Sequence, residues 1–427
     1  MQYPNYPEYI TSRLDSNIEI PKSWEEKRLK FIASHNDESL PETTPDEFEM
    51  EYIDISSVDL IKGIQAFEIT TFEQAPSRAR RLVKNGDTIV STVRTYLKAI
   101  APIKDVSDNT IVSTGFAVIR PREDIDAGYL SYFLQNQNFV ELVVANSVGV
   151  SYPAINASDL VCIPAYYPKR IEEQEKIASF LDYKTQQIDQ LIEKKKELIE
   201  KLEEQRIAII TQAVTKGIDE NAKLKPSGVD WLGDVPEHWE ISKIRWFIKV
   251  GSGDYLDNVS MEAKSTVSCQ IPVIGGNGLM AYTSIENTSE NALVVGRVGA
   301  HCGNVHLVRT KSWVTDNALR IKIIDSFDQD YLYWLLRTMK LNDDANKNAQ
   351  PLITGETIKS RTVPIPPIEN QLEIVRYIEV ELAKLSLLEQ ATQLTIEKLE
   401  EYRSALITSA VTGKIDVREI ELPKEFQ

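Results

Sequence analysis

Two histidines and one cysteine stand close together in the segment HCGNVH, which runs from His301 to His306. These side chains bind zinc, but a structural zinc site needs four ligands at characteristic spacings. The other two cysteines, Cys162 and Cys269, are distant in the sequence and follow no such pattern. We therefore interpret HCGNVH as a turn whose imidazoles pack or face a ligand, and we expect no metal.

Catalytic and cofactor-binding signatures are the next features to weigh. The sequence contains no G-x-x-x-x-G-K-[ST] phosphate loop, and GSGD at Gly251 lacks the strand, loop and helix that would aim a helix N-terminus at phosphate. There is no Asn/Asp-Pro-Pro-aromatic string of the kind used by amino-methyltransferases. The four histidines form no Ser/His/Asp grouping. We expect a chain that is not an enzyme and binds no cofactor itself.

The elements that must position these residues belong to a unit that occurs twice. Residues 199–215 and 396–412 are identical at thirteen of seventeen positions, and the alignment extends without a gap to residues 171–215 and 368–412. Upstream, IPKSWEEKRLKFI from Ile20 matches VPEHWEISKIRWFI from Val235. Between these markers, NGDTIVSTVR from Asn85 matches ENALVVGRVG from Glu290 more weakly. The unit has constant ends and a variable middle.

The constant segments have the apolar repeat of a coiled coil. Steps of three and four residues, maintained without Pro or Gly, are the heptad signature. Gly217 and Gly413 follow the two runs as stop signals. Two such helices in one chain most simply pair antiparallel. The predicted seam comprises Ile177, Leu181, Ile188, Leu191, Leu198, Leu202 and Ile209 in the first helix, and Ile374, Ile378, Leu385, Leu388, Leu399, Tyr402 and Leu406 in the second.

Composition narrows the class of protein. The chain has 427 residues, of which 42% are hydrophobic and 26% charged, as in a globular protein of several domains. No apolar run is long enough for a membrane helix, the start has no signal-peptide pattern, and three scattered cysteines suit a reducing compartment. We expect a cytoplasmic protein. The net charge of −16 does not exclude nucleic acid, because binding depends on local patches.

The combination of motifs resembles the specificity subunit of Type I restriction–modification systems. The features that carry the resemblance are the duplicated Pro-x-x-Trp starts, the EEQ and ENQ openings of the helices, and the RxAxITxAVT endings. VDWLGDVPEHWE from Val229, IPVIGGNGLMAYT from Ile271, and the run from Gly296 to Ala318 also look like family hallmarks. The resemblance covers about Ile20 to Asp416.

The resemblance implies a mixed α/β fold. Two pseudo-repeated globular α+β target recognition domains would be separated by two long antiparallel coiled-coil helices. The ranges that we predict are an N-terminal segment 1–23, recognition domain 24–165, helix 166–219, linker 220–236, recognition domain 237–365, helix 366–415 and C-terminal tail 416–427.

The resemblance also implies a role in DNA recognition. Each domain would read one half of a bipartite double-stranded DNA site, and the coiled coil would set the spacer and dock two modification (methyltransferase) subunits. Restriction/translocase subunits would join the complex, and no membrane would be involved. S-adenosylmethionine would be bound by the modification subunits, which would methylate adenine.

Candidate DNA-binding residues in the first variable region are basic or aromatic. Arginine can fork to guanine, and arginine or lysine can neutralise phosphate. The alternative is a solvated surface paired with nearby acids. The candidates are Arg78, Arg80, Arg81, Lys84, Arg94, Tyr96 and Lys98.

Glycine-rich loops supply the candidates in the second variable region. Glycine lets a backbone approach closely, asparagine can pair with adenine edges, and Arg297 follows a predicted strand. The alternative is a set of structural turns. The candidates are Ser252, Tyr255, Asn258, Asn277, Gly278, Tyr282, Arg297 and His301.

Two other classes of protein stay open at this point. One is a fused restriction or methylation enzyme with activity in this chain, and binding of S-adenosylmethionine to the isolated chain would identify it. The other is a coiled-coil adaptor without a DNA role, which would protect no two-part sequence in a footprint.

Overall fold

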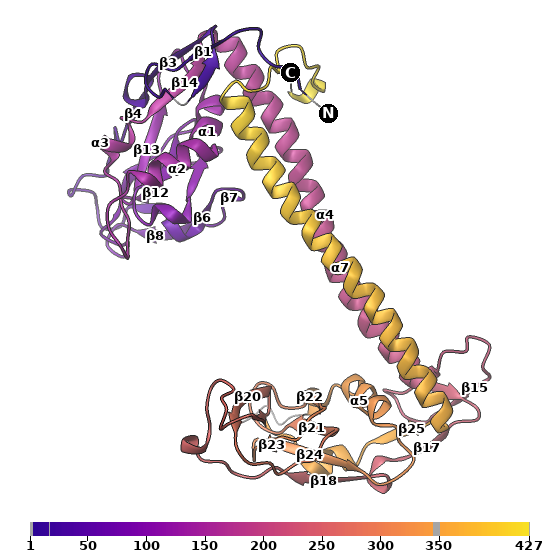
Figure 1. Cartoon of the computed structure of the whole chain (residues 1–427). Helices are drawn as coiled ribbons and strands as arrows, with labels where there is room; N and C mark the ends of the chain where they lie inside the picture. Colours follow the sequence, from indigo (N-terminus) through magenta and orange to yellow (C-terminus); the bar gives the residue numbers. More distant parts are fainter. Residues whose placement is uncertain (1–2, 17, 345–350, 427) are drawn as a thin grey trace. The chain divides into compact units, whose positions relative to one another are not determined.

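A computed structural model describes residues 3–16, 18–344 and 351–426 (Figure 1). The chain divides into two compact units. Unit 1 comprises Met1–Lys195 and Leu394–Gln427, and unit 2 comprises Lys196–Gln393. Each unit therefore combines a globular domain with segments of both long helices.

The two long helices are α4 (Ile171–Lys216) and α7 (Ile368–Val411), which lie side by side in Figure 1. They are 46 and 44 residues long, or about 69 and 66 Å at a rise of 1.5 Å per residue. Gly217 and Gly413 follow them at φ values of 76° and 72°, a conformation that ends a helix at little cost only for glycine. The predicted helix 166–219 is wrong at its start, because residues up to Pro168 form a strand.

The seam between the helices differs in part from the predicted one. Leu191, Leu388 and Tyr402 are exposed, at 41%, 47% and 47%. Ile192 and Arg403, each one position along from a predicted seam residue, are buried instead, and Thr392 is buried as well. Asp189 bonds to Arg403 within unit 1, and Glu389 bonds to Arg206 within unit 2, so the continuous helices run antiparallel as predicted.

Two sheets form the globular part of unit 1. The first has the strand order β11-β10-β13-β4 and the second β8-β5-β12-β9, in which β12 and β5 are parallel. Helix α1 (Ala127–Gln135), followed by α2 (Gln137–Ala145), packs on the first sheet. The strands are β4 (Ala33–His35), β5 (Glu49–Ile53), β8 (Glu68–Thr71), β9 (Ala79–Leu82), β10 (Thr88–Ser91), β11 (Ile100–Pro102), β12 (Thr110–Ser113) and β13 (Phe116–Pro121).

Unit 2 repeats this topology with one strand fewer in its second sheet. Its first sheet has the order β18-β24-β21-β22 and its second β20-β19-β23, in which β19 and β23 are again parallel. Helix α5 (Gln329–Thr338) corresponds to α1. The strands are β18 (Ile248–Ser252), β19 (Ile271–Gly275), β20 (Gly278–Thr283), β21 (Ala292–Gly296), β22 (Val305–Val308), β23 (Trp313–Val314) and β24 (Ala318–Ile323).

A two-stranded pair leads into each long helix. In unit 1, β3 (Trp24–Arg28) pairs with β14 (Pro164–Pro168), and in unit 2, β17 (Glu240–Lys243) pairs with β25 (Thr362–Ile365). The predicted boundary between 165 and 166 therefore falls inside a strand. The remaining elements are β1 (Tyr9–Thr11), β2 (Glu19–Pro21), β6 (Val58–Asp59), β7 (Gly63–Ile64), α3 (Ala157–Leu160), β15 (Leu224–Pro226), β16 (Asp234–Pro236), α6 (Gly355–Lys359) and short 3-10 turns.

A buried glutamine fastens each long helix to its domain. Gln174 accepts a hydrogen bond from the Asp126 amide at 2.9 Å and donates to the carbonyls of Asp124 and Pro168. Gln371 accepts from the Asp328 amide at 2.7 Å and likewise donates to two carbonyls. Each of these aspartates caps the next helix, α1 or α5. The Gln of the EEQ and ENQ motifs thus satisfies loop backbone that would otherwise be buried unpaired.

The end of each long helix is held by the opposite half of the sequence. The Tyr129 hydroxyl donates to the Val411 carbonyl at 3.1 Å in unit 1, and the Tyr331 hydroxyl donates to Val214 at 2.9 Å in unit 2. Both tyrosines are fully buried, and burial raises their pKa well above the usual value. Each domain is therefore closed by a helix end that lies far away in the sequence, 282 residues in unit 1 and 117 residues in unit 2.

Candidate nucleic-acid interface

Glycine-lined loops meet at one end of the sheets in unit 2. A Cβ added at Gly296 would lie 2.4 Å from the Gly276 carbonyl oxygen and 2.6 Å from that of His301. A Cβ at Gly253 would lie 2.1 Å from the Thr315 oxygen. These contacts leave no room for a side chain, so the glycines let four chain segments approach one another closely.

Arg297 lies at the centre of this group. Its amide donates to the Asn317 carbonyl at 2.9 Å, and its guanidinium donates to the Ser252 hydroxyl at 3.2 Å. The Asn277 side chain accepts a bond from Asn304 at 3.4 Å, on the turn between β19 and β20 where Gly278 has a φ of 93°. The structure thus brings together five predicted residues, which are Ser252, Asn277, Gly278, Arg297 and His301.

Two of the other three predicted residues of unit 2 lie further along the loop after β18, and the third lies on β20. Tyr255 is 75% exposed and Asn258 is exposed on the loop after β18. Tyr282 is half-buried at the far end of β20 from Gly278, where its backbone pairs with Glu262. At about 3.3 Å per residue, that end of the strand is roughly 13 Å from the turn.

Arg78 and Arg94 are the exposed arginines of the predicted set in unit 1. Arg78 pairs with Asp54 at 2.7 Å and donates to the Tyr52 hydroxyl. Burial acts to raise the pKa of Asp54, but hydrogen bonds from Ser56 and Tyr52, with the charge of Arg78, outweigh it and lower that pKa. The Arg94 guanidinium lies 4.9 Å over the Tyr152 ring.

Two predicted residues of unit 1 have structural partners, a third is half-buried, and two others are open to solvent. Arg80 stacks over the Phe72 ring at 4.4 Å, and Lys84 pairs with Glu38. Arg81 is half-buried, and this burial lowers its pKa. By contrast, Tyr96 is 51% exposed, and Lys98 is exposed in a left-handed conformation. The basic cluster at 78–84 is therefore largely committed to the fold, which favours the segment from Arg94 to Lys98 as the accessible part.

Thr92 occupies in unit 1 the framework position that Arg297 occupies in unit 2. The Thr92 amide donates to the Gly115 carbonyl at 2.8 Å, as Arg297 does to Asn317, and its carbonyl accepts from Ile155, as that of Arg297 does from Ile353. Thr92 was not among the predicted residues. The alignment of NGDTIVSTVR with ENALVVGRVG already places the two in one column, and this was the available signal.

The side chains of HCGNVH have three different surroundings. His301 is exposed, whereas Cys302 is buried with its sulfur 3.5 Å from the Asn342 side-chain oxygen. His306 is half-buried with Nε2 3.4 Å from the Gly276 carbonyl, and burial lowers its pKa. Within residues 3–16, 18–344 and 351–426, no group of three or more His, Cys, Asp or Glu side chains is arranged to hold a metal.

The sequence matches the family described as Type I restriction modification DNA specificity domain over two stretches, residues 21–201 and 236–398. These stretches cover most of the chain, one in each copy of the duplicated unit. The chain belongs to this family.

Individual relatives are similar at a lower level. The EcoprrI specificity subunit of Escherichia coli is 26% identical over 132 residues, which is 31% of this chain and 33% of that subunit. The MjaIX specificity subunit of Methanocaldococcus jannaschii is 23% identical over 435 aligned residues, covering 94% of this chain and 95% of that subunit.

Solved structures share the fold. A chain from a structure of the type I R-M system, described for its complex assembly and conformational transition, has a TM-score of 0.75 and 21% identity, covering 93% of this chain and 99% of its own. The HsdS subunit from Thermoanaerobacter tengcongensis has a TM-score of 0.55 and 21% identity, covering 93% and 98%. No helix in the described ranges has the length and apolar character needed to cross a membrane.

Proposed function

We propose that this chain reads a bipartite double-stranded DNA sequence, with one half-site for each globular domain, as the non-catalytic subunit of a Type I restriction–modification complex. The observation that supports this most directly is the pairing of one repeated frame with two different sets of loop residues. The backbone position that holds Thr92 in unit 1 holds Arg297 in unit 2. Two such sites on one frame suit a ligand with two unlike parts, because base edges are distinguished by side-chain chemistry.

The long helices are the proposed docking surface for two modification subunits. In unit 2, α7 leaves Leu372, Val380 and Leu387 exposed by 39%, 53% and 68%, on the side away from the buried seam. Contiguous exposed apolar residues mark protein contacts. The modification subunits supply S-adenosylmethionine in this proposal, restriction/translocase subunits join them, and the complex acts in the cytoplasm. The helix pair sets the unread spacer.

Methylation mapping tests the proposed function. Cells that express this chain with its neighbouring methyltransferase are expected to carry methylated adenine in a split motif with a fixed gap. A host strain without the chain is the control and should lack that motif. A continuous methylated motif, or the same motif without the chain, would contradict the proposal.

A second experiment separates the reader from an enzyme. The isolated chain is expected to bind no S-adenosylmethionine in equilibrium dialysis, while its complex with the modification subunits binds it. Stoichiometric binding by the isolated chain would assign the chemistry to this chain instead.

A further inference from the structure

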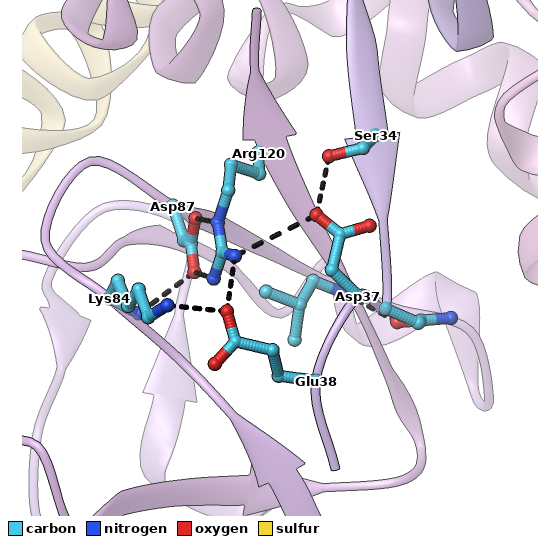
Figure 2. A network of polar contacts seen from close by, with 8 residues as sticks. Ser34, Asp37, Glu38, Lys84, Asp87 and Arg120 are labelled. Atoms are coloured by element: carbon cyan, nitrogen blue, oxygen red, sulfur yellow. Dashed lines mark hydrogen bonds and ion pairs between the residues drawn. The ribbon is translucent and has the colours of Figure 1, made fainter.

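Arg120 forms a network of ion pairs with nearby acidic residues on the first sheet of unit 1 (Figure 2). Arg120 on β13 forms two hydrogen bonds of 2.8 Å to Asp87, which is 1% exposed, and a third to Glu38. Asp37 lies 3.7 Å from the same guanidinium. Hydrogen bonding of the guanidinium to Asp87, which accepts, is the largest cause that raises the pKa of Arg120 above its usual value. Unit 1 therefore neutralises this cation with carboxylates of its own.

The same place in unit 2 keeps the cation and loses every carboxylate. Ser34 pairs with Arg120 across β4 and β13, and the matching pair across β18 and β24 is Lys249 with Lys322. The alignment that places Asn85 with Glu290 puts Asp87 in the column of Ala292. Counting on from the strands, Asp37 and Glu38 correspond to Ser252 and Gly253.

A cavity of about 560 Å³ lies at this place in unit 2, and Ala292, the counterpart of Asp87, lines it. Three cations line it, which are Lys249, Arg320 and Lys322, and no acidic residue does. The charge of Arg320 is compensated, because its guanidinium donates to the Ser252 and Asn287 carbonyls and lies 3.3 Å from Asp254. Among the described residues, neither lysine ammonium has an ion-pair partner, so the free positive charge of the cavity belongs to the two lysines.

Two lysines in this arrangement disfavour the empty state. Lys249 and Lys322 are directly opposite each other on antiparallel strands, and like charges in that position repel. A chain with a net charge of −16 has many acids to place nearby, as unit 1 does. An anion from outside would relieve the repulsion in the way that Asp87 relieves it for Arg120.

We propose that this cavity binds a phosphate group of the DNA backbone between Lys249 and Lys322. The proposal rests on the proposed function and adds to it a contact that positions the duplex without reading bases. DNA is favoured over a free anion because of continuity with the loop group. Gly251 lines the cavity, and the next residue, Ser252, accepts the hydrogen bond from Arg297.

The test measures the salt dependence of DNA binding. The full chain, purified with its modification subunits, is titrated with a duplex that carries the mapped motif, between 50 and 200 mM NaCl. Lys249→Gln/Lys322→Gln is expected to reduce the slope of log K against log salt by about 0.9, the value for one phosphate contact. At 0.1 M salt this corresponds to roughly eightfold weaker binding, equal for matched and mismatched duplexes.

Two further variants sharpen the test. Ala292→Asp restores the carboxylate that unit 1 has at this place, and it is expected to weaken DNA binding in the same sequence-independent way. Lys223→Gln removes an exposed linker lysine outside the cavity and should leave the slope unchanged. Circular dichroism of the lysine variants is expected to match the parent, since the altered lysines are exposed.

The possible outcomes are distinguishable. An unchanged slope in the double variant, with normal binding of the parent, would overturn the phosphate site and leave DNA reading intact. A rise in melting temperature with inorganic phosphate that the double variant loses, together with an unchanged slope, would assign the cavity to a free anion and also overturn the proposal. A parent complex that binds no duplex would contradict the proposed function itself.

Discussion

The two copies of the repeated unit attach the long helices to their domains in the same way, but they carry different side chains in their loops. Gln174 and Gln371 make the same three kinds of hydrogen bond, and Tyr129 and Tyr331 close the domains in the same way. The loop columns differ, as in Thr92, which is buried, and Arg297, which is half-buried. The shared polar residues therefore fix the frame, while residues at other positions of the unit have diverged after duplication.

The two halves of the helix pair show the same contrast with energetic consequences. Arg403 and Arg206 are equivalent positions, but Arg403 is 8% exposed and pairs with Asp189 at 2.9 Å. Arg206 has a side chain 27% exposed and pairs with Glu389 and Ser386. A less exposed ion pair is screened less by solvent and costs more to break. Equivalent residues can thus contribute unequally to stability.

The largest expected effect comes from the shared glutamines. Gln174→Ala leaves a buried amide and two carbonyls of the loop unpaired, at about 1–3 kcal/mol for each buried group. We expect a loss of about 3–5 kcal/mol in the free energy of unfolding, and the same for Gln371→Ala. Urea denaturation, monitored by hydrogen exchange, measures the loss for both variants. Losses of stability that differ strongly between the two variants would contradict the view that the two glutamines have equivalent roles.

The helix pair provides the second prediction. Arg403→Ala removes a side chain that is only 9% exposed and should cost about 2–3 kcal/mol, whereas Arg206→Ala should cost about 1 kcal/mol or less, because the Arg206 side chain is 27% exposed. Thermal unfolding of the two variants under the same buffer measures the difference. Equal losses of stability in the two variants would show that the exposure of the arginine does not determine how much each ion pair contributes.

The third prediction concerns the aligned position at which unit 1 has Thr92 and unit 2 has Arg297. Arg297→Ala is expected to weaken DNA binding by about 1–3 kcal/mol and to relax choice at one position if its guanidinium is bidentate to guanine. Thr92→Ala should have a smaller effect, confined to the other half of the site. Binding to a panel of single-substitution duplexes measures both. Relaxed choice in both halves after one substitution would refute separate reading.

The smallest expected effect is a pH dependence that only unit 2 should show. Burial lowers the pKa of His306 below 6.5, so the folded state keeps this imidazole neutral. As pH falls below about 6.5 the unfolded chain takes up a proton that the folded chain does not, and stability is lost. By strand pairing, the equivalent residue of unit 1 is Ala101, which cannot titrate.

The comparison of pH 7.5 with pH 5.5 tests this prediction through the melting temperature. His306→Gln is expected to reduce the fall in melting temperature between pH 7.5 and pH 5.5, because glutamine does not titrate. Hydrogen exchange should locate the loss of protection in unit 2. An equal loss in unit 1, or a decrease that the variant leaves unchanged, would contradict it.

Sequence patterns predicted the parts of the fold that depend on local or repeated signals. The duplication, the long helices and their ends at Gly217 and Gly413 are confirmed. The seam at Leu191, Leu388 and Tyr402 was wrong, because apolar spacing alone did not reveal that the polar Arg403 is buried in place of Tyr402. The strand β14 was missed because its partner, β3, lies far earlier in the chain.

The candidate interface was predictable only in part, for a similar reason. Chemistry and loop placement led to Arg297, Ser252 and Asn277, which the structure groups. The DNA contacts themselves stay a prediction. Sequence reasoning included Arg81, which is half-buried in the fold, and Lys84, whose ion-pair partner Glu38 lies 46 residues earlier in the chain. It also missed the cavity between Lys249 and Lys322, because the absence of three carboxylates becomes visible only when two folded copies are compared.

The meeting of the chain ends in unit 1 has a consequence for cleavage. The Asp416 amide donates to the Pro4 carbonyl, and the Tyr9 hydroxyl donates to the Gly413 carbonyl at 2.9 Å. With Tyr331 bonded to Val214, each domain holds pieces of both halves of the polypeptide. A protease cut in the linker at 221–223, where Asn221 and Lys223 are exposed, would therefore yield two fragments that remain associated and separate only when the protein unfolds.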